Sequence, residues 1–412
     1  MKIRSITLFD SLLPPVDEER LAALGRFAHR ARRAYEKAGF EVQTTRLATN
    51  LLAARPGTPW ASAPVDLAMQ LEAACQEQGF EYISLGPAGK EMLPRLPAVF
   101  AATQRIFATA QIVDPQTRAI DREAIEGAAQ VMVQAARIEN GFGNLRFAAL
   151  ANVPPGTPFL PAAYHDDGPP AFAIATQAAD LAVQACHAAP DAAAAARALT
   201  AQIEAHAARL VAVADHLVDD PGPPLGRVRF GGIDFSPAPF PTPECSIGTA
   251  LETLSGAPAG SAGTLAAAAL LTHAIDQAQF PRAGFCGLML PVLEDAVLAQ
   301  RAAERRLQIA ALLQWSAVCG TGLDTVPLPG NTDQRALIRI LLDVAALSAR
   351  LQKPLTARLM PLPGKAAGDL VHFDFDYFAD GGVLPLGNGE QEGLLSKTEQ
   401  LDLCALGKRR IR

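Results

Sequence analysis

The chain has few of the features that mark several large classes of protein. Its 412 residues include six cysteines, and no two of them form a Cys-x-x-Cys pair. This scatter is typical of reduced thiols and argues against a zinc cage. Long apolar runs are also missing. The longest uncharged stretch, 253–275, consists mainly of Ala, Gly and Ser with a Pro and a His, and is too weakly apolar to span a bilayer.

Positive charge is in deficit as well. The formal net charge is −6, and no basic stripe is interleaved with the aromatic residues, which make up only 6% of the chain. Nucleic-acid binding therefore has no electrostatic signature. No Gly-Lys-Ser/Thr loop is present, and no Gly-x-Gly-x-x-Gly follows the first strand candidate, so no motif points to a nucleotide cofactor. The first residues, MKIRSITLFDSLLPP, carry charge too early for a signal peptide.

These absences leave a cytoplasmic protein with a small-molecule ligand as the expectation, without a nucleic-acid or membrane partner. Whether identical chains form an oligomer, and whether a divalent metal is bound, stays open at this point. Half of the residues are apolar and 19% are charged, so a chain of this length can bury a large core.

Strand-like and helix-like segments alternate along almost the whole chain. Predicted strands cover 2–9, 40–47, 80–86, 106–113, 145–152, 171–176, 228–235, 285–290, 323–328, 355–361 and 371–377. Predicted helices cover 17–38, 64–78, 121–139, 190–219, 244–255, 264–279, 291–315 and 332–352. This alternation predicts an α/β fold with largely parallel strand pairing. We expect a single domain, residues 1–412, in two intimate halves of about 1–220 and 227–412 with a seam at 219–226.

Four turns rich in Gly, Ser and Pro lie between strand-like and helix-like segments. They are GGIDFSPAPFP (231–241), APAGSAGT (257–264), AGFCGLMLPVLED (283–295) and VCGTGLDTVPLPG (318–330). Such turns cluster around pockets, because glycine permits sharp turns and close approach of the backbone to a ligand. The second turn could hold an anion through backbone N–H groups at the start of helix 264–279.

Side chains able to carry chemistry occur in and near these turns. Cys319 lies near Asp324, and such a thiol is either a nucleophile or proton carrier or an inert buried cysteine. His165 precedes Asp166 and Asp167 in a loop, where it suits acid–base work, while the two carboxylates orient it, hold a metal or are merely solvated.

Two further patterns have a functional and a structural interpretation. In VHFDFDYF (371–378), period-2 geometry places His372, Asp374 and Asp376 on one strand face, either as metal ligands or as the polar side of an amphipathic strand. In the turn at 231–241, Asp234 and Ser236 either belong to a site or form a turn before a helix.

In order along the chain, these segments resemble the family called domain of unknown function 711. Arg46 in TTRLA falls where that family carries an Arg, and FAALAN with PFLPAAYH (147–165) resembles a family segment in which Asn152 and His165 match. FGGIDFSPAPFP matches at Asp234, Ser236 and Pro239, and VCGTGLDTVPLPG at Cys319, Gly322, Leu323 and Asp324. AGFCGLMLPVLED (283–295) also resembles a family segment.

The resemblance implies a ten-stranded barrel like that of pyruvate formate-lyase, with helices outside. The C-terminal FADGGVLPLG lacks the Arg and the aromatic residue of a glycyl-radical loop, so the fold alone does not predict radical chemistry. The chain also departs from the family after His165, at Ala262-Gly263-Thr264 in place of His-Gly-Thr, and at Phe285-Cys286 in place of Leu-Ser. Either the substrate differs from the family's or catalysis has been lost.

We therefore expect an enzyme that uses acid–base chemistry of the lyase or hydrolase kind on a small polar or anionic metabolite; a non-catalytic metabolite-binding protein is the alternative. The catalytic candidates are His165, Asp234, Cys319 and Asp324. The substrate-binding candidates are Asn152, Ser236, Gly263, Thr264, Cys286, Gly287 and Gly322. The candidate metal ligands are Asp166, Asp167, His372, Asp374 and Asp376.

Overall fold

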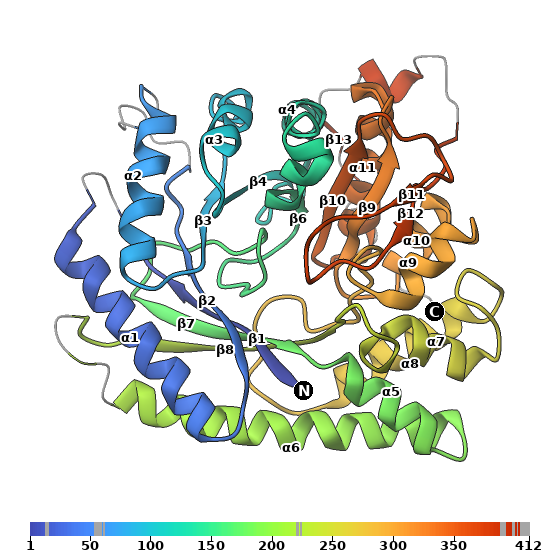
Figure 1. Cartoon of the computed structure of the whole chain (residues 1–412), viewed down its shortest axis with the longest axis horizontal. Helices are drawn as coiled ribbons and strands as arrows, with labels where there is room; N and C mark the ends of the chain where they lie inside the picture. Colours follow the sequence, from blue (N-terminus) through green and yellow to red (C-terminus); the bar gives the residue numbers. More distant parts are fainter. Residues whose placement is uncertain are drawn as a thin grey trace.

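A curved sheet with helices on its outer side forms the body of the molecule (Figure 1). The computed structural model describes residues 1–12, 16–52, 60, 62–219, 222, 225–387, 393–397, 400, 401 and 403. Half of the predicted seam at 219–226 lies outside these residues, and the division into two halves stays a prediction.

Within the described residues the main sheet has eleven strands, nine of them in one path. Their order is β8-β7-β1-β2-β3-β4-β6-β10-β9, and the short β5 and β13 extend from β4. The strands of the path are β1 (Lys2–Phe9), β2 (Val42–Ala48), β3 (Tyr82–Pro87), β4 (Ile106–Val113), β6 (Phe147–Ala151), β7 (Ala171–Gln177), β8 (Arg229–Ala238), β9 (Gly322–Pro329) and β10 (Leu355–Leu362). The short strands are β5 (Ile120–Asp121), β11 (Leu370–Val371), β12 (Gly381–Gly382) and β13 (Gln400–Leu401).

The directions of the strands divide the path into three blocks. The central strands β1, β2, β3, β4 and β6 are mutually parallel. The pair β7–β8 and the pair β9–β10 are each parallel internally, but β7 is antiparallel to β1 and β10 is antiparallel to β6. The predicted α/β fold with mostly parallel pairing is therefore confirmed.

A closed barrel is not confirmed, because the sheet is open between β8 and β9. The segment 282–291 lies in this gap and carries one parallel bridge to each edge strand, Ile233–Arg282 and Pro291–Asp324. The predicted strand at 285–290 is thus irregular backbone. Asp234 accepts backbone hydrogen bonds from this segment in place of a regular ladder.

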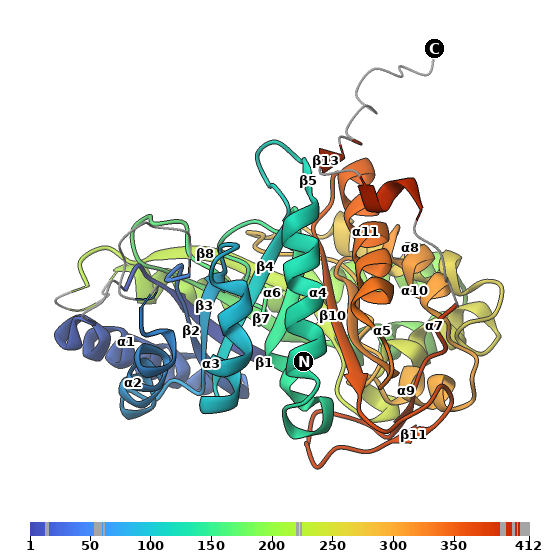
Figure 2. The same ribbon diagram turned by 90° about the horizontal axis from the view of Figure 1, so that it is seen from above.

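The helices lie on the outer side of the sheet, and α6 runs along one side of the molecule (Figure 1). Their bounds are α1 (Glu18–Lys37), α2 (Pro64–Glu77), α3 (Leu96–Ala102), α4 (Arg122–Ala135), α5 (Ala179–Ala188), α6 (Ala192–Asp219), α7 (Ile247–Ser255), α8 (Thr264–Gln277), α9 (Ala296–Ala303), α10 (Ile309–Ser316) and α11 (Gln334–Leu351). Short 3₁₀ turns are η2 (Leu93–Arg95), η3 (Glu139–Arg146), η4 (Pro243–Cys245) and η5 (Leu394–Lys397). Helices α4 and α11 pack against each other, as Figure 2 shows, and both contact β4, β6 and β10.

Two predicted elements differ from the structure in an informative way. The predicted helix 291–315 is interrupted, because Pro291 bridges to β9 and Arg305 takes a left-handed conformation with φ of 60° between α9 and α10. The predicted strand 371–377 is regular only at Leu370–Val371, although His372, Asp374 and Asp376 are exposed and the aromatic residues between them are partly buried.

The sheet core explains where polar groups can be found. Strands β9 and β10 are buried along their whole length, as expected of strands covered on both faces, yet β9 contains Asp324 and β10 contains Arg358. Buried charges need partners, so these two side chains mark the inner face of the sheet as a polar site. Among the described helices, none combines the length and apolarity needed to cross a membrane.

Candidate active site: a cavity on the inner face of the sheet

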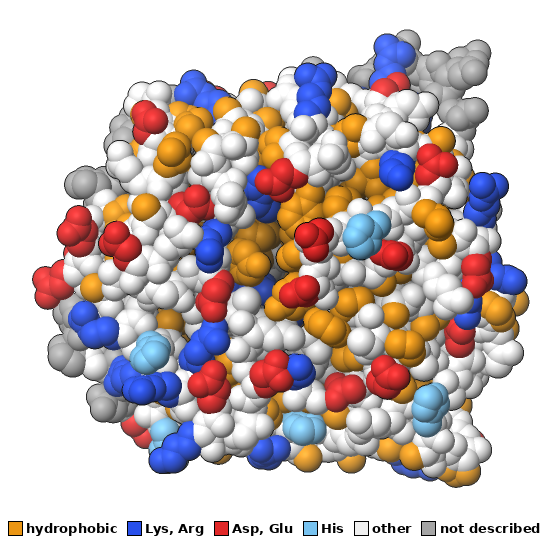
Figure 3. Space-filling model, in the orientation of Figure 1, with side chains coloured by type: hydrophobic (Ala, Val, Ile, Leu, Met, Phe, Trp, Pro, Cys, Tyr) orange, Lys and Arg blue, Asp and Glu red, His pale blue; other side chains and the backbone are white. Residues whose placement is uncertain are grey.

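A cavity of about 840 Å³, including its open mouth, lies on the inner face of the curved sheet. Side chains from β1, β2, β3, β4, β6, β9 and β10 line it, together with the loop 159–162 and the segments 285–294 and 375–377. Figure 3 shows a hollow near the centre of one face, with hydrophobic side chains deep in it and basic and acidic side chains around it.

Strand periodicity aims the polar side chains into this cavity. Thr44 and Arg46 lie two residues apart on β2, and Thr356 and Arg358 lie two residues apart on β10. Residues two apart on a strand share a face, so each pair projects from the same side of the sheet. Each of these four residues is more than nine-tenths buried.

A buried arginine joins two carboxylates at one end of the cavity. Arg358 Nε donates to Asp324 Oδ1 at 2.6 Å, and Arg358 Nη2 donates to Glu294 Oε1 at 2.7 Å. Burial lowers the pKa of Arg358, but Asp324 and Glu294 raise it by more, so it lies above its ordinary value. Burial raises the pKa of Asp324 against the attraction of Arg358.

Arg4 continues this chain of ion pairs from β1. Its Nη2 donates to Glu294 Oε2 at 2.6 Å, and its guanidinium lies 4.7 Å from the ring centroid of Tyr377. The other terminal nitrogen, Nη1, is buried and donates to none of the described groups. Thr321 also lines the cavity, and its buried Oγ1 has no hydrogen-bond partner among the described residues.

Arg46 differs from the other two arginines because no described carboxylate pairs with it. Its Nε donates to Thr44 Oγ1 at 2.9 Å, and its guanidinium lies 5.7 Å from the ring centroid of Tyr82. Burial and the nearby charge of Arg4 lower the pKa of Arg46 to about 10, so it is still cationic at neutral pH. A cation held in this way costs free energy unless an anion joins it.

Another part of the cavity lining is apolar. Phe107, Phe159, Phe285 and Met289 lie there with the loop 160–162. Tyr82 and Phe107 meet edge to face, with ring centroids 5.4 Å apart.

The segment 373–378 closes one side of the cavity with aromatic rings. Phe375 and Tyr377 line the cavity, and Phe142 of η3 packs against Phe373, Phe375 and Phe378 at centroid distances of 5.6, 5.1 and 6.0 Å.

Of the four predicted catalytic residues, Asp324 lines the cavity, and the other three lie elsewhere in the described chain. His165 is buried and lines a second hollow with Asp166 and Arg229. Its Nε2 donates to the carbonyl of Gly168 at 3.0 Å, and its Nδ1 lies 3.6 Å from Asp166 Oδ1.

Asp234 is fully buried and holds the segment that fills the gap in the sheet. Its carboxylate accepts from the backbone N–H groups of Phe285 and Cys286 at 2.7 and 2.9 Å, and from Ser236 Oγ at 2.7 Å. Burial raises the pKa of Asp234 to about 6, against these hydrogen bonds. Ser236 Oγ in turn accepts from the N–H of Gly287 at 3.1 Å.

The remaining candidates of this region hold backbone in place. The Cys286 thiol donates to the carbonyls of Ile233 and Ala283 at 3.3 and 3.2 Å, and burial raises its pKa to about 12. Gly287 lies so close to Gly320 that an added Cβ would be 2.3 Å from the Gly320 Cα.

Cys319 and Gly322 flank the start of β9. Cys319 is buried, and its carbonyl accepts a hydrogen bond from Lys353 Nζ. Gly322 has φ of +92°, and an added Cβ would lie 2.5 Å from the Thr356 carbonyl. Asn152, on the far side of β6, donates from Nδ2 to Ser348 Oγ at 2.8 Å.

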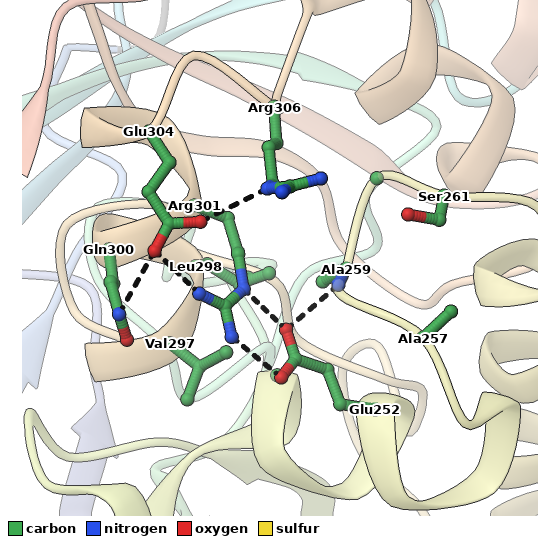
Figure 4. A network of polar contacts seen from close by, with 12 residues as sticks. Glu252, Ala257, Ala259, Ser261, Val297, Leu298, Gln300, Arg301, Glu304 and Arg306 are labelled. Atoms are coloured by element: carbon green, nitrogen blue, oxygen red, sulfur yellow. Dashed lines mark hydrogen bonds and ion pairs between the residues drawn. The ribbon is translucent and has the colours of Figure 1, made fainter.

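The loop 257–264 holds a carboxylate of the chain itself (Figure 4). Glu252 Oε1 accepts from the N–H of Ala259 at 2.8 Å, and both Glu252 oxygens accept from Arg301. Thr264 Oγ1 donates to the Ser261 carbonyl at 2.9 Å, and Gly263 is the N-cap of α8 with φ of 99°.

The candidate metal ligands do not come together in the described residues, where no group of three His, Cys, Asp or Glu side chains is placed to hold a metal ion. Asp166 Oδ1 accepts from the N–H of Gly168 at 3.1 Å, and Asp167 Oδ1 accepts from Ser11 Oγ at 2.8 Å. His372 Nδ1 is 2.7 Å from Asp380 Oδ1, and Asp374 and Asp376 are exposed.

Sequence reasoning missed Arg4, Glu294 and Arg358 and noted Arg46 only for its place in the resemblance. A charged side chain inside an apolar strand was the available signal. LTARLMPL and KIRSITLF each carry one arginine in a stretch that is otherwise uncharged after its first residue.

Comparison with known proteins places these residues in a family. A family model described as "Uncharacterised ACR (DUF711)" matches residues 1–378. A UPF0210 protein of Pyrobaculum arsenaticum is 30% identical over 398 residues, which cover 90% of this chain and 87% of that protein. A UPF0210 protein of Methanopyrus kandleri is 30% identical over 320 residues, covering 74% and 70%. One of Desulforudis audaxviator is 28% identical over 402 residues, covering 90% and 88%.

Proposed function

The chain belongs to the DUF711 family, and we propose that it is an enzyme of small-molecule metabolism that binds a small anionic metabolite in the cavity and acts on it by acid–base chemistry. One observation carries the proposal: Arg46 is a buried cation on the cavity wall that pairs with no described carboxylate. An anionic group of the substrate would supply the missing partner.

The neighbouring arginines support this role for Arg46. Arg358 donates from Nε to Asp324 and from Nη2 to Glu294, whereas Arg4 donates only from Nη2, to Glu294. The donors left for a ligand are therefore the terminal nitrogens of Arg46 and, after a small shift, Nη1 of Arg4.

The acid–base step is assigned to Asp324. It lines the cavity, and only its Oδ1 is engaged by Arg358, while burial raises its pKa above the ordinary value. A raised pKa makes a carboxylate a stronger base, which suits a group that accepts a proton from a substrate and returns it. The second candidate function is a non-catalytic metabolite-binding protein, which is favoured because His165, Asp234 and Cys319 are not among the residues that line the cavity.

Native mass spectrometry of the full chain, as purified from cells, tests the binding step. We expect a small anion to co-purify with the protein and to be lost from Arg46→Gln but kept by Arg26→Gln, which removes the same charge from the exposed face of α1. An anion retained equally by all three proteins would contradict the proposal.

Once the ligand is identified, Asp324→Asn separates the two functions. An enzyme would still bind the ligand in this variant but would no longer convert it. Failure of the wild-type protein to convert the ligand would support the metabolite-binding protein instead.

A further inference from the structure

The composition of the cavity lining indicates the chemical class of the ligand. We propose that the cavity takes a monocarboxylate with a flat aromatic body, bound through its carboxylate to Arg46. This inference rests on the proposed function and deepens it.

The charge of the lining sets the charge of the ligand. The lining contains three arginines (Arg4, Arg46 and Arg358) and two carboxylates (Glu294 and Asp324), so its formal sum is +1. Because both carboxylates are held by arginine at 2.6 to 2.7 Å, a single positive charge is left for the ligand. In a buried site an uncompensated second negative charge is costly.

This sum distinguishes a carboxylate from a phosphate ester. A guanidinium fork binds either group in a bidentate manner. A phosphate monoester, however, carries about 1.5 to 2 negative charges near pH 7, and the cavity offers no second unpaired arginine to match them. One carboxylate matches the available charge.

The body of the ligand is indicated by the aromatic side chains. Six of the twenty lining residues are aromatic, although aromatics make up 6% of the chain. They are Tyr82, Phe107, Phe159, Phe285, Phe375 and Tyr377. Aromatic rings prefer offset or edge-to-face neighbours with centroids 4.5 to 7 Å apart, so such walls favour a flat ring over a polar or branched body.

The charged and the aromatic parts of the cavity adjoin each other in a fixed order. Arg46 and Tyr82 are register partners on β2 and β3, and Phe107 lies on the next strand, β4. The guanidinium of Arg46 lies over the Tyr82 ring, and Tyr82 meets Phe107 edge to face. A carboxylate at Arg46 thus places an attached ring beside Tyr82 and Phe107.

Isothermal titration calorimetry of the full-length protein with matched probes tests this inference. Phenylacetate carries one charge and a ring, acetate lacks the ring, 2-phenylethanol lacks the charge, and phenylmalonate carries a second carboxylate. We expect phenylacetate to bind at least tenfold more tightly than each of the other three and than inorganic phosphate. Arg46→Gln should weaken phenylacetate at least tenfold, whereas Arg26→Gln should not change it.

A second variant tests the aromatic wall separately. Phe107→Leu keeps an apolar side chain of similar size and should weaken phenylacetate more than acetate, and its melting temperature shows whether it is folded. If phenylmalonate or phosphate bound more tightly than phenylacetate, and this binding were lost in Arg46→Gln, the proposal of a monocarboxylate ligand would be overturned. The proposed function would still stand. If no anion in the set binds, or if binding survives Arg46→Gln, both proposals fail.

Discussion

Arg358 Nε lies 2.6 Å from Asp324 Oδ1, and the two side chains project from β10 and β9, the neighbouring parallel strands at one end of the sheet path. The same guanidinium also holds Glu294, which connects it to Arg4. One arginine therefore compensates two buried carboxylates that would otherwise repel each other.

Removing Arg358 should strongly destabilise the fold. We expect Arg358→Ala to lower the free energy of unfolding by about 3–5 kcal/mol, because it leaves Asp324 and Glu294 buried and uncompensated. Urea denaturation measures this difference. The triple variant with Asp324→Asn and Glu294→Gln should recover part of the loss. A loss below about 1 kcal/mol in the single variant would show that the carboxylates are neutral or solvated.

Replacement of Arg46 should have the opposite effect on stability. Burial and Arg4 disfavour its charge, so Arg46→Leu should raise the free energy of unfolding by about 1 kcal/mol while removing anion binding. Thermal unfolding without ligand checks the sign. A destabilised Arg46→Leu would mean that Arg46 already has a strong partner in the free protein.

Asp234 should make stability depend on pH between about 4 and 6. Burial raises its pKa to about 6 in the folded protein, whereas it is ordinarily 3.8, so in this interval the folded state binds the proton more tightly. The contribution of Asp234 to stability should then fall as the pH rises, by roughly 1.4 kcal/mol per pH unit. The difference in unfolding free energy between wild type and Asp234→Asn, measured from pH 3 to 8, isolates this term. A difference that is constant with pH, or that grows as the pH rises, would contradict it.

The close approach of Gly287 and Gly320 should not tolerate a side chain. An alanine Cβ at Gly287 would lie 2.3 Å from the Gly320 Cα, and backbone on both sides would have to move. We expect Gly287→Ala to cost about 2–4 kcal/mol by chemical denaturation. Gly387→Ala is the matched control, because Gly387 has no atom within 4 Å of its added Cβ. Equal stability of the two variants would be the contrary result.

The ion pair between Glu252 and Arg301 should stabilise the fold modestly, and only while Glu252 is ionised. Burial raises the pKa of Glu252, but Arg301 and the Ala259 N–H lower it by more, so the pKa lies below its ordinary 4.5. Because both side chains are partly exposed, Glu252→Gln should cost about 1 kcal/mol at pH 7. Stability from a lowered carboxyl pKa is present above the unfolded value and is lost as the pH falls. The difference between wild type and variant should therefore shrink below about pH 4. A stability difference that did not change with pH would instead mean that Glu252 acts through packing and not through its charge.

The sequence predicted most elements of the fold because their signals are local. Apolar runs located all nine strands of the sheet path, and the predicted strand 285–290, outside that path, is irregular. Apolar residues spaced three and four apart, such as Leu337 and Leu341, located α11. The side chain of Asp333 caps that helix. The preceding Asn331 and Thr332 are also of types that favour N-caps, so residue type alone does not decide among the three. Whether the sheet closes depends on a single bridge at each side of 282–291, which no local pattern encodes.

The candidate site was less predictable because it depends on which strands become neighbours. Asp324 was found from its place beside a glycine-rich turn. Its partner Arg358 is 34 residues away in sequence, and Glu294 is 64 residues from Arg358. The glycine-rich turns 283–295 and 318–330 indicated a pocket, and they supply Phe285, Met289, Glu294, Thr321 and Asp324 to the cavity lining. Their glycines accommodate close backbone packing, however, and most of the other polar lining side chains lie along the strands.

The position of Arg4, Arg46, Asp324 and Arg358 within strands has an evolutionary consequence. Folds whose sites lie in loops can acquire new specificities by exchanging loops, with little effect on the scaffold. Here the four charged positions are also positions in strands of the sheet, so a new specificity that required a change at any of them would require a compensating change in the sheet. Specificity and folding are under joint selection, and new activities should arise through paired substitutions on adjacent strands.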